Sequence, residues 1–263
     1  MPHTVAIIQA RIASTRLPEK VLLDIAGQPM IVRVVERVKR ANTIDRVVIA
    51  TTTDPSDDPI KDLCEDRGYT CFRGNQFNVL DRYYHAAQLY NADIVVRITA
   101  DCPMIDPAEI DHVVQVLVEE KADFTANRLP PPWKRTYPIG LDTEVCTYKA
   151  LERAWKEAER SEELENVMPY LYAEKSRFRT VVIDYEVDYG HYRWTVDTRE
   201  DLDLARQVYA HFDGNDDFSW LDVIDLFDRH PDLILINAGV KPKTVYDVDD
   251  RLSTITRESS KSG

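Results

Sequence analysis

Three cations and two hydroxyl groups stand close together near the start of the chain. They belong to the stretch from Ala10 to Lys20, which follows the apolar run Val5 to Gln9, and they are Arg11, Ser14, Thr15, Arg16 and Lys20. Ligands of open α/β sheets bind at the carboxyl ends of strands. Arginine grips phosphate with a planar fork and lysine acts as a mobile point charge, so this loop favours a polyphosphate ligand. A solvated basic loop is the alternative. The stretch has no glycine, which excludes a Walker A sequence and a dinucleotide fingerprint.

Two aspartates follow apolar stretches further along the chain. Asp101 comes soon after the run Asp93 to Ile98, and Asp197 directly follows Arg193 to Val196. Carboxylates at strand ends are placed to meet phosphates, and Mg²⁺ is usually bound by one or two carboxylates together with substrate phosphates and water. Asp197 could equally cap a helix, and Asp101 could form a turn before proline. The pattern leaves both interpretations open.

Two further groups of polar residues stand near expected strands. Asp142 and Glu144 are two residues apart, so on a strand they would share a face and could bind substrate hydroxyls or a cation. A solvent-facing strand edge is the alternative. Thr51 and Thr52 close the second apolar run, where their hydroxyls could face a base or ribose or be ordinary loop residues.

The composition restricts the class of protein. The chain has 263 residues, a net charge of −13 and 44% hydrophobic residues. An acidic chain is a poor general nucleic-acid binder, and no apolar run is long enough to cross a bilayer. The start of the chain lacks the features of a signal peptide, and the scattered cysteines suit reduced thiols, so we expect a cytoplasmic protein that binds a small anionic ligand.

The elements that must position these residues alternate along the chain. Apolar runs predict strands at 5–9, 45–50, 69–72 and 93–98, and helical spacing predicts helices from Met30, at 59–67, from Asn78 and at 107–120. This alternation predicts a parallel, doubly wound sheet. For the chain as a whole we expect a three-layer α/β fold whose doubly wound sheet is mixed but mostly parallel.

The second half is less regular. The Pro-rich stretch 127–140 excludes a regular element. Beyond it the pattern predicts a helix at 148–159, a second helix containing Asn166 to Leu171, strands at 178–183 and 193–196, a helix after Thr198 and one at 220–227. We expect a single domain over 1–248, in which 128–147 is an acceptor or dimer insertion, and a disordered tail over 249–263.

Several motifs in order resemble those of the acylneuraminate and KDO cytidylyltransferases, and most closely their spore-coat-polysaccharide-type branch. These motifs are Gln9 to Lys20, Gly27 to Met30, Ala50 to Thr52, Phe72 to Gly74 with Asn78 to Tyr83, Arg97 to Pro103, Gly140 to Val145 and Arg193 to Leu202. The resemblance implies a nucleotide-diphospho-sugar transferase fold, related to GT-A. It also implies CTP, Mg²⁺, an acidic or phosphorylated sugar-like acceptor, and a homodimer.

The resemblance also implies roles for single residues. Arg11, Ser14, Arg16 and Lys20 would contact the triphosphate, and the backbone of Ala10 with Thr51, Thr52 and Arg73 would surround cytosine and ribose. Asp101, in the nucleotide site, would bind metal together with Asp197, and Asp142 and Glu144 would lie near the acceptor. The chain departs from the family at Ala13, where glycine is common, and at Leu164 to Val167, where a histidine is missing.

The implied reaction is transfer of CMP from CTP to the acceptor with release of pyrophosphate, for synthesis of a surface polysaccharide or glycoconjugate. Arg11 and Lys20 would stabilise the charge that develops on phosphate, and Asp197 would be the base if the acceptor is an anomeric hydroxyl. Three alternatives stay open: an NDP-sugar pyrophosphorylase that uses another nucleotide, a GT-A glycosyltransferase, and a regulatory nucleotide-binding module.

Overall fold

A computed structural model describes residues 2–129, 135–174 and 177–241 of the chain. The strands of its large sheet, in chain order, are β1 (Thr4–Gln9), β4 (Arg46–Thr52), β5 (Thr70–Gly74), β6 (Ile94–Thr99), β7 (Phe124–Ala126), β8 (Glu144–Thr147) and β9 (Thr180–Val182). In space their order is β5-β4-β1-β6-β8-β7-β9. Each neighbouring pair is parallel except the two that β8 makes, with β6 and with β7. A small second sheet pairs β2 (Asp24–Ile25) with β3 (Gln28–Pro29).

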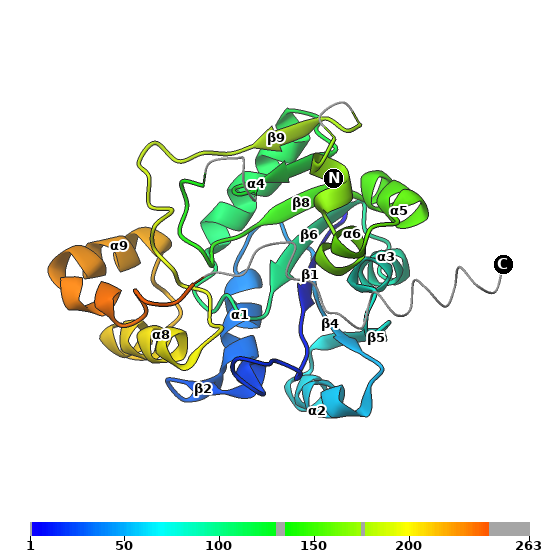
Figure 1. Ribbon diagram of the computed structural model, residues 1–263. Helices are drawn as coiled ribbons and strands as arrows, with labels where there is room; N and C mark the ends of the chain where they lie inside the picture. Colours follow the sequence, from blue (N-terminus) through cyan, green and yellow to red (C-terminus); the bar gives the residue numbers. More distant parts are fainter. Residues whose placement is uncertain (1, 130–134, 175–176, 242–263) are drawn as a thin grey trace.

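Helices surround this sheet (Figure 1). They are α1 (Met30–Val38), α2 (Asp58–Arg67), α3 (Val79–Leu89), α4 (Pro107–Glu119), α5 (Tyr148–Glu157), α6 (Ser161–Asn166), α7 (Pro169–Tyr172), α8 (Arg199–His211) and α9 (Trp220–Arg229). Short 3₁₀ turns occur at Lys20–Leu22, Pro55–Asp57 and Pro231–Leu235. Among the described residues, no helix is both long enough and apolar enough to cross a membrane.

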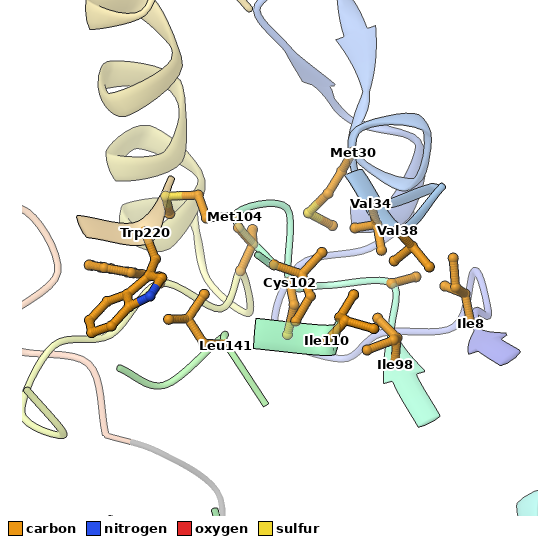
Figure 2. Close-up of a cluster of buried hydrophobic side chains, with 14 of the residues drawn as sticks. Ile8, Met30, Val34, Val38, Ile98, Cys102, Met104, Ile110, Leu141 and Trp220 are labelled. Atoms are coloured by element: carbon orange, nitrogen blue, oxygen red, sulfur yellow. The ribbon is translucent and has the colours of Figure 1, made fainter. Parts of the chain in front are cut away.

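The two faces of the sheet have separate apolar cores, because successive strand side chains point to opposite faces. In β1, Ala6 and Ile8 pack with the helices α1 and α4, whereas Val5 and Ile7 pack with α3. Figure 2 shows the first of these cores, where Ile8 and Ile98 of the sheet meet side chains of α1 and α4. The same core extends to Trp220 at the start of α9.

Local sequence signals explain several helix ends. The helix α2 ends at Gly68, whose φ of 67° is left-handed and therefore suits glycine. Asn78 caps α3 through a side-chain bond from the amide N of Asp81, and Thr198 caps α8 in the same way with Asp201. The predicted three-layer, mostly parallel α/β architecture is confirmed.

Two predicted elements are wrong. The single helix expected around Asn166 to Leu171 is two short helices, because Val167 has a φ of 70° and Pro169 starts a new helix there. The strand expected at 193–196 is not a member of the sheet and makes only an isolated bridge between Arg193 and Ile139. Instead, the amide N of Trp194 donates to the carbonyl of Ile139 at 2.6 Å, and the amide N of Val196 donates to the carbonyl of Asp101 at 2.8 Å.

Two predicted segments lie partly or wholly outside the described residues. Of the insertion expected at 128–147, residues 128–129 and 135–143 contain no helix or strand, and residues 144–147 form β8. Residues 130–134 and the tail expected at 249–263 are not described. All four cysteines are free thiols, as expected.

Candidate active site

Two hydrogen bonds shape the loop after β1, one within the loop and one to a side chain in the segment that follows β4. The amide N of Glu19 donates to the carbonyl of Ile12 at 3.3 Å, and the amide N of Ile12 donates to Asp57 Oδ1 at 2.7 Å. Asp57 lies just after β4 and also accepts a bond from the Thr52 hydroxyl. Positive φ occurs in this loop at Glu19 (56°) and not at Ala13, so alanine in place of the family's glycine is not strained there.

Lys20 lies where the loop meets Asp101 and Asp197. Its Nζ is 2.7 Å from Asp101 Oδ2, 2.8 Å from Asp197 Oδ1 and 3.0 Å from the carbonyl of Val196. Because the amide N of Val196 donates to the carbonyl of Asp101 at 2.8 Å, the two aspartates are also held together through the backbone. The sequence predicted these three residues separately, and the structure brings them to one point.

Two arginines hold the other oxygen of Asp197. Arg16 Nη2 lies 2.9 Å from Asp197 Oδ2, and Arg193 Nη2 lies 2.8 Å from the same atom. Arg193 also contacts Asp201 through Nε at 2.9 Å. Thr198, not Asp197, caps α8, so the helix-cap interpretation of Asp197 is wrong.

These charges control ionisation in the cluster. Burial alone would raise the pKa of Asp197, but the charges of Lys20 and Arg16 and the hydrogen bonds from Lys20 and Arg193 lower that pKa to about 2. Burial alone would lower the pKa of Lys20, yet Asp101 and Asp197 raise it overall. The aspartate is therefore an anion and the lysine a cation at neutral pH.

Arg11 and Ser14 lie on the open part of the same loop. The Arg11 side chain is 42% exposed, and its Nη2 lies 4.0 Å from Glu165 Oε1. The Ser14 hydroxyl accepts a bond from the amide N of Leu17 at 3.4 Å, which closes a turn. Arg11 is thus accessible to a ligand, whereas Ser14 already helps to shape the loop.

The residues predicted to surround the base are largely used as scaffold. Arg73 donates from Nε to the carbonyl of Thr52 at 2.7 Å and from Nη2 to that of Asp54 at 2.9 Å, and it pairs with Asp58. Thr52 is buried and donates to Asp57. The Thr51 hydroxyl is buried and makes no bond within the described part of the chain. The amide N of Ala10 donates to the carbonyl of Ala50 at 3.1 Å, which extends the pairing of β1 with β4.

The two carboxylates predicted near the acceptor each meet arginines. Arg135 contacts Asp142 with two nitrogens, at 2.6 and 3.3 Å, and Arg128 Nε lies 3.2 Å from Asp142 Oδ2. Glu144 is buried against Arg97. Asp142 precedes β8, so the two do not share a strand face, and the solvent-facing alternative is wrong for Glu144. We call these three arginines and two carboxylates the arginine cluster.

A family model described as cytidylyltransferase matches residues 5–212, which is most of the chain. The chain belongs to the cytidylyltransferase family. It is 29% identical over 233 residues to the spore coat polysaccharide biosynthesis protein SpsF of Bacillus subtilis, covering 86% of this chain and 94% of SpsF. It is 39% identical over 117 residues to the 3-deoxy-manno-octulosonate cytidylyltransferase of Geobacter sulfurreducens, covering 44% of this chain and 46% of that enzyme. A solved cytidylyltransferase from Leptospira borgpetersenii superposes with a TM-score of 0.83 and 31% identity, covering 89% of this chain and 97% of that one.

The resemblance and the fold predicted from the sequence are therefore confirmed. Several residues of this cytidylyltransferase's site were not predicted. Arg193 and Asp201 flank Asp197 at spacings of four residues, a signal that was available in the sequence. Asn237 was not detectable in this way: its Nδ2 donates to the carbonyl of Arg193 and to Asp201 Oδ1, both at 2.9 Å, from a segment beyond α9.

The donor set of this cytidylyltransferase fits a magnesium ion supplied with nucleotide. Within the described ranges there is no group of three or more His, Cys, Asp or Glu side chains that could hold a metal. Asp101 and Asp197 nevertheless each place an oxygen within hydrogen-bond distance of one ammonium nitrogen. Two carboxylates so close together, completed by phosphate oxygens and water, are a usual arrangement for Mg²⁺.

Proposed function

We propose that this protein transfers CMP from CTP to an acidic, sugar-like acceptor and releases pyrophosphate. The observation that carries the proposal is the meeting of Lys20 with Asp101 and Asp197 beneath the cationic loop. This edge of the sheet joins cations for a triphosphate to carboxylates for its metal. The likeness to SpsF supports a product used in surface polysaccharide or glycoconjugate synthesis.

The reaction is an in-line displacement at phosphorus. An acceptor oxygen attacks the α-phosphorus of CTP, the new O–P bond forms as the bond to the leaving oxygen breaks, and the electron pair departs with pyrophosphate. Arg11, Arg16 and Lys20 would neutralise charge on the phosphoryl oxygens and on the leaving group. The loop contributes further by holding these cations in place before the substrate arrives.

Asp101 and Asp197 would hold Mg²⁺, which polarises the phosphoryl group and orients the reactants when bound. With a pKa of about 2, Asp197 is a poor proton acceptor, which favours its role as a metal ligand over the role of general base. Mg²⁺ dependence is thus part of the proposal.

We place the acidic part of the acceptor at the arginine cluster. Arg97, Arg128 and Arg135 outnumber Asp142 and Glu144 there, which leaves an excess of positive charge. Arginine forks suit carboxylates and phosphates equally, so the cluster is compatible with either acidic group. In this proposal Asp142 and Glu144 orient the arginines and do not themselves contact the acceptor's anion.

The nucleoside would lie along the ends of β4 and β5. The buried Thr51 hydroxyl, which has no hydrogen-bond partner among the described residues, supports that placement, whereas Arg73 and Thr52 would act mainly by holding the strand ends in position. The cytoplasmic location and the homodimer expected from the sequence stay predictions, and light scattering of the purified protein tests the dimer.

A pyrophosphate-release assay tests the proposed function. CTP, UTP, ATP and GTP are each supplied with Mg²⁺ and a panel of 3-deoxy-ulosonic acids, uronic acids, phosphonates and sugar phosphates. Release with CTP and an acidic acceptor is the expected result. Release only with another nucleotide and a sugar 1-phosphate would contradict the proposal and make the protein a pyrophosphorylase.

A further inference from the structure

The charges that contact Asp197 and its neighbours balance one another. Lys20, Arg16 and Arg193 supply three positive charges, and Asp101, Asp197 and Asp201 supply three negative charges. The Lys20 side chain is 12% exposed and reaches three acceptors at 2.7 to 3.0 Å. The ammonium group therefore occupies the position between the two carboxylates that a metal ion would need.

We propose that Lys20 acts as a counterion that keeps a divalent metal out of the Asp101–Asp197 pair until a polyphosphate is bound. This inference rests on the proposed function, because it takes a triphosphate as the ligand of the loop. It goes further by assigning an order of binding to this site.

The physical reason is electrostatic. A dication that enters a neutral, partly buried cluster meets a unit positive charge at contact distance, and this repulsion is strong where water is largely excluded. A polyphosphate brings several negative charges to the same loop. It gives Lys20 and Arg16 alternative partners, frees an oxygen of each aspartate and supplies further ligands to the metal.

The geometry makes such an exchange local. Lys20 is the first residue of a 3₁₀ turn, and its flexible four-carbon stem can move the ammonium group without moving the strand ends. Asp101 and Asp197 stay in place because the bond from Val196 N to the Asp101 carbonyl links their backbones. Arg193, held by Asp201, keeps one oxygen of Asp197 fixed while Lys20 leaves the other.

The test measures metal binding and not turnover. Mn²⁺ is titrated into the protein without nucleotide, and bound Mn²⁺ is followed by electron paramagnetic resonance. The same titration is repeated with inorganic tripolyphosphate, with a protein-free sample that corrects for Mn²⁺ held by the anion alone. Wild type should bind Mn²⁺ at least about tenfold more tightly with tripolyphosphate than without it.

Substitutions separate charge from size. Lys20→Met should bind Mn²⁺ without any anion at least about tenfold more tightly than wild type, whereas Lys20→Arg, which keeps the charge, should not. Adding Asp101→Asn to Lys20→Met should abolish the gain. Lys39→Met is the matched control, because Lys39 is a half-exposed lysine at the C-terminal end of α1, just beyond its last residue, and pairs with Glu36.

Two results would overturn the proposal: equal Mn²⁺ affinity of wild type with and without tripolyphosphate, or no gain in a folded Lys20→Met. Circular dichroism checks folding, and the two wild-type arms can overturn the proposal even if the variant does not fold. Since no arm contains CTP or an acceptor, a wrong nucleotide or acceptor assignment would appear in the pyrophosphate-release assay alone.

Discussion

The carboxylate of Asp57 holds the backbone of Ile12, with Oδ1 2.7 Å from the amide N, although the two residues are 45 positions apart. The same carboxylate accepts a hydrogen bond from the Thr52 hydroxyl. One buried side chain in the 3₁₀ turn after β4 thus fixes both the end of that strand and the loop that follows β1.

We predict that Asp57→Ala loosens this loop. Loss of the acceptor leaves two donors unsatisfied, so the free energy of unfolding should fall by about 2 kcal/mol, and affinity for CTP should fall about tenfold or more. Urea unfolding and calorimetric titration of CTP measure the two effects. Asp62→Ala, at an exposed position of α2, is the control and should change neither quantity. Unchanged CTP affinity in a destabilised Asp57→Ala would show that the loop does not depend on this bond.

Arg193 should be irreplaceable by lysine. Its planar fork contacts Asp197 and Asp201 at once, which a single ammonium group cannot do with the same geometry. We expect Arg193→Lys to lower kcat about 10- to 100-fold, by misplacing Asp197, with a smaller change in the KM for CTP. Steady-state kinetics measure this split. Arg199→Lys is the control, because that arginine is largely exposed on α8. Equal kcat for Arg193→Lys and wild type would refute the positioning role.

The sequence predicted the fold well because its strand runs and helix caps are local. The same is true of the position of Asp101 just after β6, which follows from the parallel alternation, whereas Asp197 follows an irregular segment and not the strand expected there. The contact of Lys20 with both aspartates could not be predicted, because it joins residues 81 and 177 positions apart. Arg73 shows a second limit: a pattern identifies an arginine at a strand end but not that its donors already bind the carbonyls of Thr52 and Asp54.

Glu109 gives the protein a pH-dependent stability. Burial, and to a lesser degree the charge of Asp106, raises its pKa to about 7, although hydrogen bonds with Tyr137 and Trp220 act in the opposite direction. The folded state thus holds a proton that the unfolded state has lost between pH 4.5 and 7. The free energy of unfolding should therefore fall as pH rises through this range, by about 3 kcal/mol in total.

The variant Glu109→Gln should remove this part of the pH dependence and be more stable than wild type at pH 8. A glutamine oxygen can still accept the Tyr137 hydroxyl. Urea unfolding at pH 5 and pH 8 measures the difference, with Glu119→Gln, at an exposed position of the same helix, as control. Parallel pH profiles for wild type and Glu109→Gln would show that Glu109 titrates normally.

Arg135 should distinguish the acceptor from the nucleotide. It contacts Asp142 with two nitrogens in the arginine cluster, whereas the first loop contacts Asp101 and Asp197. If the cluster binds the acidic group of the acceptor, Arg135→Ala should raise the KM for the acceptor about tenfold or more and leave the KM for CTP nearly unchanged. Arg153→Ala on α5, where the side chain is half-exposed, is the control. A similar rise in both KM values would instead indicate a general loss of structure around Asp142, and no rise in either would place the acceptor's anion elsewhere.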